Sequence, residues 1–210
     1  MNPVRTTPQA RLVRRGRLLA WLTIGWNTLE GVVAVAAGLL AGSIALVGFG
    51  VDSYVEVLSG AVIVWRLSKE RHGQAVSHAA EQRAVRIIAV TFLLLAAGVA
   101  TESVRSLATA ARPDESLPGI VLAAVSLVVM PLLARAKRRV GQQMGSRALE
   151  ADATETTLCV WLSAILLAGL SLNAVFGWWW ADPVAGLGVA YVALREGLEN
   201  WDADTADRCC

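Results

Sequence analysis

Four side chains of metal-binding type stand in this sequence as two pairs, and each pair follows a short stretch that begins Ser-x-Ala-Leu. In both cases the first side chain comes nine residues after the serine and the second comes thirteen residues after it. Residues four apart share one face of a helix, so each pair is expected to point in one direction. The pairs are Asp52 with Glu56, after Ser43, and Glu155 with Cys159, after Ser146.

Three carboxylates and one thiol make four ligands, the number that a tetrahedral divalent ion takes. Oxygen ligands alone suit Mn²⁺ or Mg²⁺, and one thiolate shifts the preference toward Zn²⁺ or Co²⁺. Both pairs lie in apolar sequence, where an unpaired charge is costly and rarely without function, and no Lys or Arg stands mid-span to neutralise them. A thiol in an apolar helix often packs as a small hydrophobe, so the role of Cys159 stays open.

A buried site of this kind couples metal to protons. Several acidic groups in a medium of low dielectric constant repel one another, so some of them hold protons when no metal is bound. The metal ion binds only after those protons leave, and their return helps to expel it. The residues therefore predict exchange of a divalent cation for protons.

The sequence around the pairs is that of an integral membrane protein. Hydrophobic residues make up 55% of the 210 residues, and the mean hydropathy is +0.52. Each of six apolar segments is close to the roughly 20 residues that cross a hydrocarbon core. We read the first as an uncleaved helix, because its apolar run is too long for a secretory signal. We therefore predict an all-α fold with six transmembrane helices, near residues 18–40, 44–65, 86–108, 117–135, 154–176 and 182–199.

The basic residues set the expected orientation. All of the 19 except Arg105 and Arg112 fall on one side of the predicted spans, and the positive-inside rule places that side in the cytoplasm. Both termini are then cytoplasmic, in a bacterial-type inner membrane, and nothing in the charge indicates nucleic acid. We divide the chain into a basic N-terminal segment (1–17), a six-helix transmembrane domain (18–200) and a short tail (201–210).

Six spans with both ends inside form two halves of three, in which the second and fifth spans run in opposite directions. This is the pattern of inverted repeats, whose substrate site lies near the midplane between the halves. A rise of 1.5 Å per residue puts each pair roughly 13 to 20 Å from its serine. With Ser43 at the outer edge and Ser146 at the inner edge of a core about 30 Å thick, both pairs reach one depth.

Other polar residues in the spans have two possible roles. Asn27 and Glu30, on the first span, could orient the ligands or carry a proton, or they could form hydrogen bonds between helices. For Glu102, nearer the outer end of the third span, helix contacts are favoured. Asp182 and Pro183 open the sixth span, where we prefer a capping role to a binding role.

The roles of two histidines and two cysteines outside the spans stay open. His72 and His78 could hold a surface metal ion, although solvated loop residues are favoured. Cys209 and Cys210, the last two residues, could pass metal to the pore or form an exposed tail without function.

Residues 43–57 and 146–160, together with the Asp-Pro start of the sixth span, resemble the cation diffusion facilitator family. The resemblance covers about residues 18–200 and implies six helices with a metal site made by pairs four apart on the second and fifth. By position, Asp52 and Glu56 match the second-helix pair, and Glu155 and Cys159 match the fifth-helix pair. Asp152 matches an acidic position three before that pair, where it could support the ligands or carry a proton.

Three departures limit what the resemblance implies. Fifth-helix pairs of the family commonly contain His and Asp, so the metal preference of Glu155 and Cys159 cannot be carried over. The position three before the second-helix pair, often an aspartate, is Phe49 here. The cytoplasmic domain that follows span six in the family is expected to be absent, so a family-type homodimer would be held by membrane helices.

We predict a transporter, not an enzyme, that exports a divalent transition metal in exchange for protons by alternating access. Zn²⁺ is favoured, with Co²⁺, Fe²⁺ or Mn²⁺ behind it, and no prosthetic group is expected. The predicted partners are the cation, protons, the lipid bilayer and a second copy of the chain; the direction of transport stays open. One alternative is a non-transporting metal-binding or interaction subunit, and another is a membrane thiol oxidoreductase that uses Cys209 and Cys210.

Overall fold

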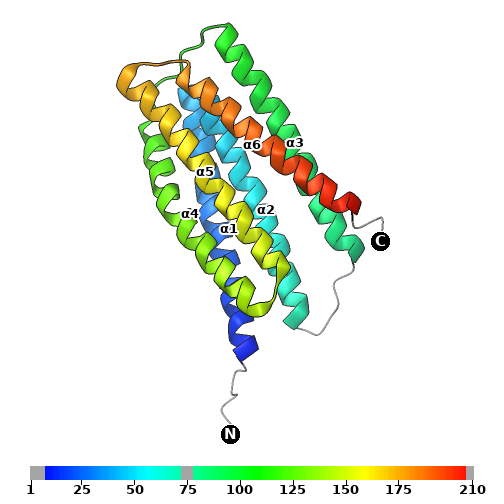
Figure 1. Cartoon of the computed structure of the whole chain (residues 1–210). Coiled ribbons are helices and arrows are strands. Elements are labelled where there is room, and N and C mark those ends of the chain that lie inside the picture. The colour runs from blue at the N-terminus through cyan, green and yellow to red at the C-terminus, as the bar shows by residue number, and fades with distance from the viewer. Residues whose placement is uncertain (1–7, 72–77, 207–210) are drawn as a thin grey trace.

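The computed structural model describes residues 8–71 and 78–206, and all regular structure within these ranges is helical. The helices lie side by side and alternate in direction, so the start of α1 and the end of α6 lie toward the same end of the bundle as the α4–α5 turn (Figure 1). Which end faces the cytoplasm stays a prediction. The six helices are α1 (Pro8–Ala41), α2 (Ile44–Arg71), α3 (His78–Ala108), α4 (Leu117–Met144), α5 (Arg147–Phe176) and α6 (Ala181–Ala206).

Four helices have the length and apolar composition needed to cross a membrane. Within the described residues these candidate spans lie in α1, α2, α4 and α5. Helix α6 is less apolar, because it carries Asp182, Arg195 and Glu196. The membrane character of the fold is thus supported, and the crossing of all six helices stays a prediction. The candidate spans are Arg11–Ala41, Ile44–Trp65, Leu117–Met144 and Asp152–Phe176.

The α1–α2 and α4–α5 turns follow one backbone path. Gly42 and Gly145 stand just after α1 and α4 with φ of +66° and +63°, a conformation that costs glycine little because it has no Cβ. The next residue in each turn donates its N–H to a glycine carbonyl on the preceding helix, Gly38 at 2.9 Å and Gly141 at 3.0 Å. The doubled stretch is therefore part of a longer repeat, Gly-x-x-x-Gly-Ser-x-Ala-Leu.

The serine of each repeat caps the helix that follows. The Ser43 hydroxyl accepts the N–H of Leu46 at 3.1 Å, and the Ser146 hydroxyl accepts the N–H of Leu149 at 3.5 Å. Each bond satisfies a backbone donor that the first helical turn leaves without a partner, and both leucines are fully buried. These matching contacts confirm that the two stretches are structurally equivalent helix starts.

Asp182 links the start of α6 to the start of α2. Its carboxylate is buried and accepts the Ile44 N–H at 3.1 Å and the hydroxyl of Ser43. The capping role predicted for Asp182 is therefore observed, but it serves α2 rather than its own helix. The contact sets the beginnings of α2 and α6 at the same level.

The helices pack as three close pairs around a shared core. Helix α1 packs on α2, α4 on α5 and α3 on α6, and α2, α5 and α6 contact one another. Figure 1 shows the α3–α6 pair beside the other four helices. The core that joins α2, α5 and α6 includes Leu46, Phe49, Leu166, Leu170 and Val189. This packing brings the middle of α2 against the middle of α5.

Several helices extend beyond the predicted spans. Helix α1 begins at Pro8, within the segment assigned to 1–17, and α6 continues to Ala206, within the predicted tail. The predicted end of the fourth span at 135 is too early, because α4 continues to Met144 and stops only before Gly145. Lys137, assigned to the following loop, is instead fully buried. The predictions for His72, Cys209, Cys210 and the side chain of His78 lie outside the described residues.

Candidate metal centre

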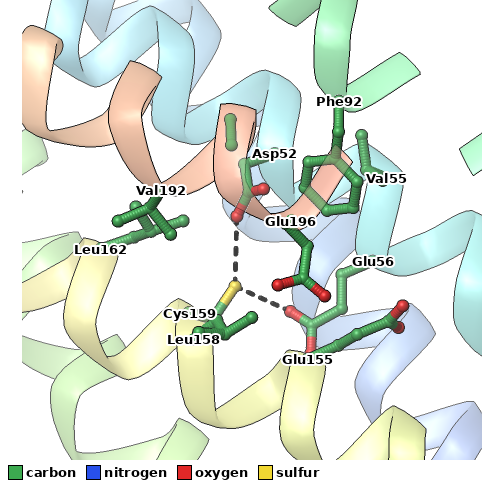
Figure 2. Close-up of a pocket in the computed structure, with 11 residues that line it drawn as sticks. Asp52, Val55, Glu56, Phe92, Glu155, Leu158, Cys159, Leu162, Val192 and Glu196 are labelled. Carbon is green, nitrogen blue, oxygen red and sulfur yellow. Dashed lines mark hydrogen bonds between the residues drawn. The ribbon is translucent and has the colours of Figure 1, made fainter. Parts of the chain in front are cut away.

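The two predicted pairs meet where α2 and α5 pack together. Asp52 and Glu56 come from α2, and Glu155 and Cys159 come from α5. The sulfur of Cys159 lies 3.3 Å from Asp52 Oδ2 and 3.0 Å from Glu56 Oε2, with the thiol as donor (Figure 2). Asp52, Glu56 and Cys159 are each buried. The antiparallel arrangement predicted from the spacing therefore brings side chains of both pairs together.

The four side chains line one small pocket with apolar walls. Its volume is about 20 Å³, about the space that one water molecule needs. A site of this size admits a single small ion rather than an organic substrate. The apolar lining residues are Val55, Phe92, Leu158, Leu162, Val192 and Ala193.

Glu155 lines the pocket from α5, the helix that also carries Cys159. It is half-buried, and its carboxylate accepts a hydrogen bond from the hydroxyl of Ser59 on α2. This bond ties the two helices together one turn beyond Glu56. The Ser59 hydroxyl leaves the second oxygen of Glu155 available to a cation, since a carboxylate has two acceptor oxygens.

The acidic side chains and the thiol line the pocket, but they are not arranged as a complete metal coordination shell. Among the described residues, no group of three or more His, Cys, Asp and Glu side chains is arranged to hold a metal ion. The thiol bonds instead occupy one oxygen each of Asp52 and Glu56.

Glu196 on α6 also lines the pocket, and the sequence analysis missed it. Its position near the end of a predicted span, close to Arg195 and Glu199, is typical of an interfacial charge. The available signal was its helical spacing: Glu196 follows Val192 by four residues and Ala193 by three, and both are apolar residues of the buried face. Three helices, α2, α5 and α6, thus contribute acidic groups.

Glu30 on α1 lies in a polar cluster beside the pocket. Its carboxylate accepts hydrogen bonds from Ser53 on α2, at 3.2 Å, and from Ser126 on α4. The Trp26 indole N–H donates to the same Ser126 hydroxyl at 3.2 Å. Ser53 directly follows Asp52, so this cluster connects Glu30 to the backbone that carries the first pair.

Asn27, one helical turn before Glu30, is fully buried. Neither its amide nitrogen nor its carbonyl oxygen has a hydrogen-bond partner among the described residues. Buried polar groups without partners are costly and call for an explanation such as a bound water molecule. Asn27 and Glu30 therefore share a polar face of α1, but neither lines the pocket.

Asp152 lies in an ion pair instead of in the pocket. Lys137 Nζ of α4 is 2.8 Å from Asp152 Oδ2 and donates to Thr156 Oγ1 at 2.8 Å, and both charged side chains are buried. The assignment of Lys137 to a loop is therefore wrong, and its partner is Asp152 rather than one of the predicted ligands. The cause is the extension of α4 past residue 135. Glu102, by contrast, pairs at the surface with Arg105 at 3.2 Å.

Comparison with known proteins gives the family. The model of the cation efflux transmembrane domain matches residues 20–201, nearly the whole chain. The chain belongs to the cation efflux family. This is a family of metal cation transporters rather than of enzymes. The match confirms the resemblance that the paired residues indicated.

Two curated relatives show similar coverage. An uncharacterized transporter of Synechocystis sp. is 28% identical over 189 residues, which are 88% of this chain and 61% of that protein. Transmembrane protein 163 of Xenopus laevis is 24% identical over 184 residues, 86% of this chain and 64% of that protein. The chain thus spans less than two thirds of the length of either relative.

Proposed function

We propose that this protein moves a divalent transition-metal cation across a membrane in exchange for protons, by alternating access. Zn²⁺ is the favoured cargo, with Co²⁺, Fe²⁺ or Mn²⁺ behind it. The ligands are Asp52, Glu56, Glu155 and Cys159. The observation that carries the proposal is the contact of Cys159, on α5, with both acids of α2 in one small pocket.

Proton coupling rests on the charges in that pocket. None of the lining residues is basic, so acids held there without metal must share protons to limit their repulsion. A bound cation takes the place of those protons, and reprotonation weakens its hold. Glu30 is the group that we assign to proton relay, since its hydrogen bond to Ser53 reaches the residue next to Asp52. Asn27, one helical turn before Glu30, is assigned a supporting role in this relay.

Asp152 has a supporting role in this proposal. Its ion pair with Lys137 holds α4 against α5 one turn before Glu155, and so positions the second pair of ligands. The fold is proposed to cross the inner membrane of a bacterium six times with both termini in the cytoplasm. A homodimer would be held by the membrane helices.

Flux in liposomes tests the proposed function. Purified protein is reconstituted with a metal-sensitive dye and a dye for pH inside, and a panel of Zn²⁺, Co²⁺, Fe²⁺ and Mn²⁺ is supplied under both polarities of a pH gradient. We expect metal uptake that is driven by the gradient and accompanied by opposite proton movement. Metal binding in detergent without flux would identify a non-transporting subunit instead.

Cysteine substitution tests the metal preference. Cys159→Ser replaces a soft thiolate with a hard hydroxyl, so the ratio of Zn²⁺ to Mn²⁺ transport should fall by about tenfold or more. The same liposome panel measures the ratio. An unchanged ratio would mean that Cys159 only packs between the helices.

A further inference from the structure

Glu196 reaches the pocket from a helix that the paired motif does not include. It lies on α6 and lines the same pocket as the two pairs. Figure 2 shows its carboxylate turned into the space beside Asp52 and Glu56. It shares the lining of that pocket with Asp52 and Glu56 of α2 and with Glu155 of α5.

The depth of Glu196 follows from the way in which α6 begins. Asp182 bonds to the first N–H of α2, at Ile44, so the two helices start at one level and run in the same direction. Along each helix axis, Glu56 lies about 18 Å from the start of α2 and Glu196 lies about 21 Å from Asp182, at 1.5 Å per residue. The shared start therefore brings Glu196 to the depth of Glu56.

The packing of α6 holds Glu196 in this orientation. Its neighbour Gly197 lies so close to Leu93 of α3 that a Cβ there would be 3.2 Å from the Leu93 backbone nitrogen. Ala193, one turn earlier, is 1% exposed. Glu199, one turn later, faces away and pairs with Arg195 at 2.7 Å on the surface. Glu196 and Glu199 are thus two acids on one helix with different surroundings.

The pocket has acceptor capacity that its own contacts do not use. Glu56 is 5% exposed, and its Oε1 has no hydrogen-bond partner among the described residues. Among the described residues that line the pocket beside Asp52, Glu56 and Glu155, none is basic. Buried acceptors without donors are stabilised by a cation, which supplies the missing positive charge.

We propose that Glu196 binds the transported cation directly and raises the number of donor residues from four to five. Four carboxylates and one thiol suit ions that accept five or six ligands, such as Mn²⁺, as well as Zn²⁺, which needs only four. Glu196 therefore broadens the range of cations that the site accepts. The inference rests on the proposed function, because it assigns a further ligand to the same site.

Measurements of metal-ion binding to the purified protein in detergent test this role. Affinities for Mn²⁺ and Zn²⁺ are measured by competition with a metal indicator for the wild type, Glu196→Gln and the matched control Glu199→Gln. We expect Glu196→Gln to weaken Mn²⁺ binding by about tenfold or more and Zn²⁺ binding by less than about threefold. Glu199→Gln should match the wild type for both ions.

The outcomes separate the two proposals. Wild-type protein that binds neither ion overturns the proposed function and this inference together. Wild-type protein that binds both ions while Glu196→Gln binds them equally well overturns only the role of Glu196. Equal losses in Glu196→Gln and Glu199→Gln would also overturn it, since these show a general effect of surface charge.

A second variant keeps the test decisive if Glu196→Gln fails to fold, as judged by circular dichroism and gel filtration. Glu196→Cys places a soft donor at the same point, so Cd²⁺ binding should strengthen by about tenfold while Mn²⁺ binding weakens. Unchanged affinities for both ions would show that the side chain at this position does not contact the cation.

Discussion

The α1–α2 and α4–α5 hairpins have one backbone design and two different chemistries. Both turn through a glycine with positive φ, and both begin the second helix with a capping serine. Nine and thirteen residues later the first hairpin carries two carboxylates, whereas the second carries a carboxylate and the thiol of Cys159. The two hairpins therefore share the turn geometry that positions the proposed ligands, while the proposed ligands themselves differ.

The hairpins differ further in the charge next to the pairs. Ten residues after each capping serine stands a hydroxyl, Ser53 or Thr156, which in both cases also bonds to the carbonyl four residues before it. Ser53 donates to Glu30, whereas Thr156 accepts from Lys137. Equivalent hydroxyls thus meet an acid in one half and a base in the other. Among the described residues, a buried basic side chain, Lys137, accompanies the second hairpin and none accompanies the first.

The largest expected effect comes from removing one ligand from each hairpin. Asp52→Asn and Glu155→Gln occupy equivalent positions, so each should lower metal flux in liposomes by more than about 100-fold, beyond the loss typical of supporting residues. Glu102→Gln, which breaks a surface pair, should transport like the wild type. Normal flux in Glu155→Gln with none in Asp52→Asn would show that only the first hairpin binds the cation.

The next largest effect is expected from breaking the buried ion pair between Lys137 and Asp152. Lys137→Met leaves Asp152 buried without its partner and should lower the free energy of unfolding by about 3–5 kcal/mol. Chemical denaturation in detergent measures the change, and Asp152→Asn combined with Lys137→Met should recover part of it. Stability unchanged in the single variant would mean that the pair does not form in the membrane domain.

The close approach of the two helices in each hairpin predicts a smaller effect, a difference in stability between two glycine variants. A Cβ on Gly38 would lie 2.8 Å from the Val47 backbone nitrogen, whereas one on Gly141 would lie 3.2 Å from that of Glu150. Gly38→Ala should therefore destabilise the protein by about 1–3 kcal/mol, through overpacking, and Gly141→Ala by less. Equal thermal stability of the two variants would contradict this order.

The capping serines predict the smallest effect. Ser43→Ala loses both the helix cap and the hydroxyl bond to Asp182, while Ser146→Ala loses only a longer cap bond. We expect costs of about 1–2 kcal/mol and about 0.5–1 kcal/mol, measured by thermal unfolding. A larger cost for Ser146→Ala would show that the contact between α2 and α6 contributes little.

The sequence permitted prediction of features that depend on local spacing. The Ser-x-Ala-Leu stretches predicted two matched helices, and the interval of four residues predicted that each pair would share one helix face. The opposite directions of the second and fifth spans predicted that both pairs would reach one depth, because all of these features follow from helix geometry. Helical spacing places Glu196 on the same face of α6 as Val192 and Ala193, but it does not predict that this face lines the pocket, and no local spacing predicts the contacts of Lys137. Both arrangements depend on how far α4 continues and on the rotation of α6, which tertiary packing sets rather than local sequence.

Absorption spectroscopy of the Co²⁺-loaded protein tests most directly whether α2 and α5 bind one cation together. Co²⁺ bound to a thiolate gives an intense charge-transfer band, so the wild type should show this band at one Co²⁺ per chain. Cys159→Ser should bind Co²⁺ without the band, and Asp52→Asn should need far more Co²⁺ to produce it. Co²⁺ binding with no band in the wild type, or a band that Asp52→Asn leaves unchanged, would contradict a site shared by the two helices.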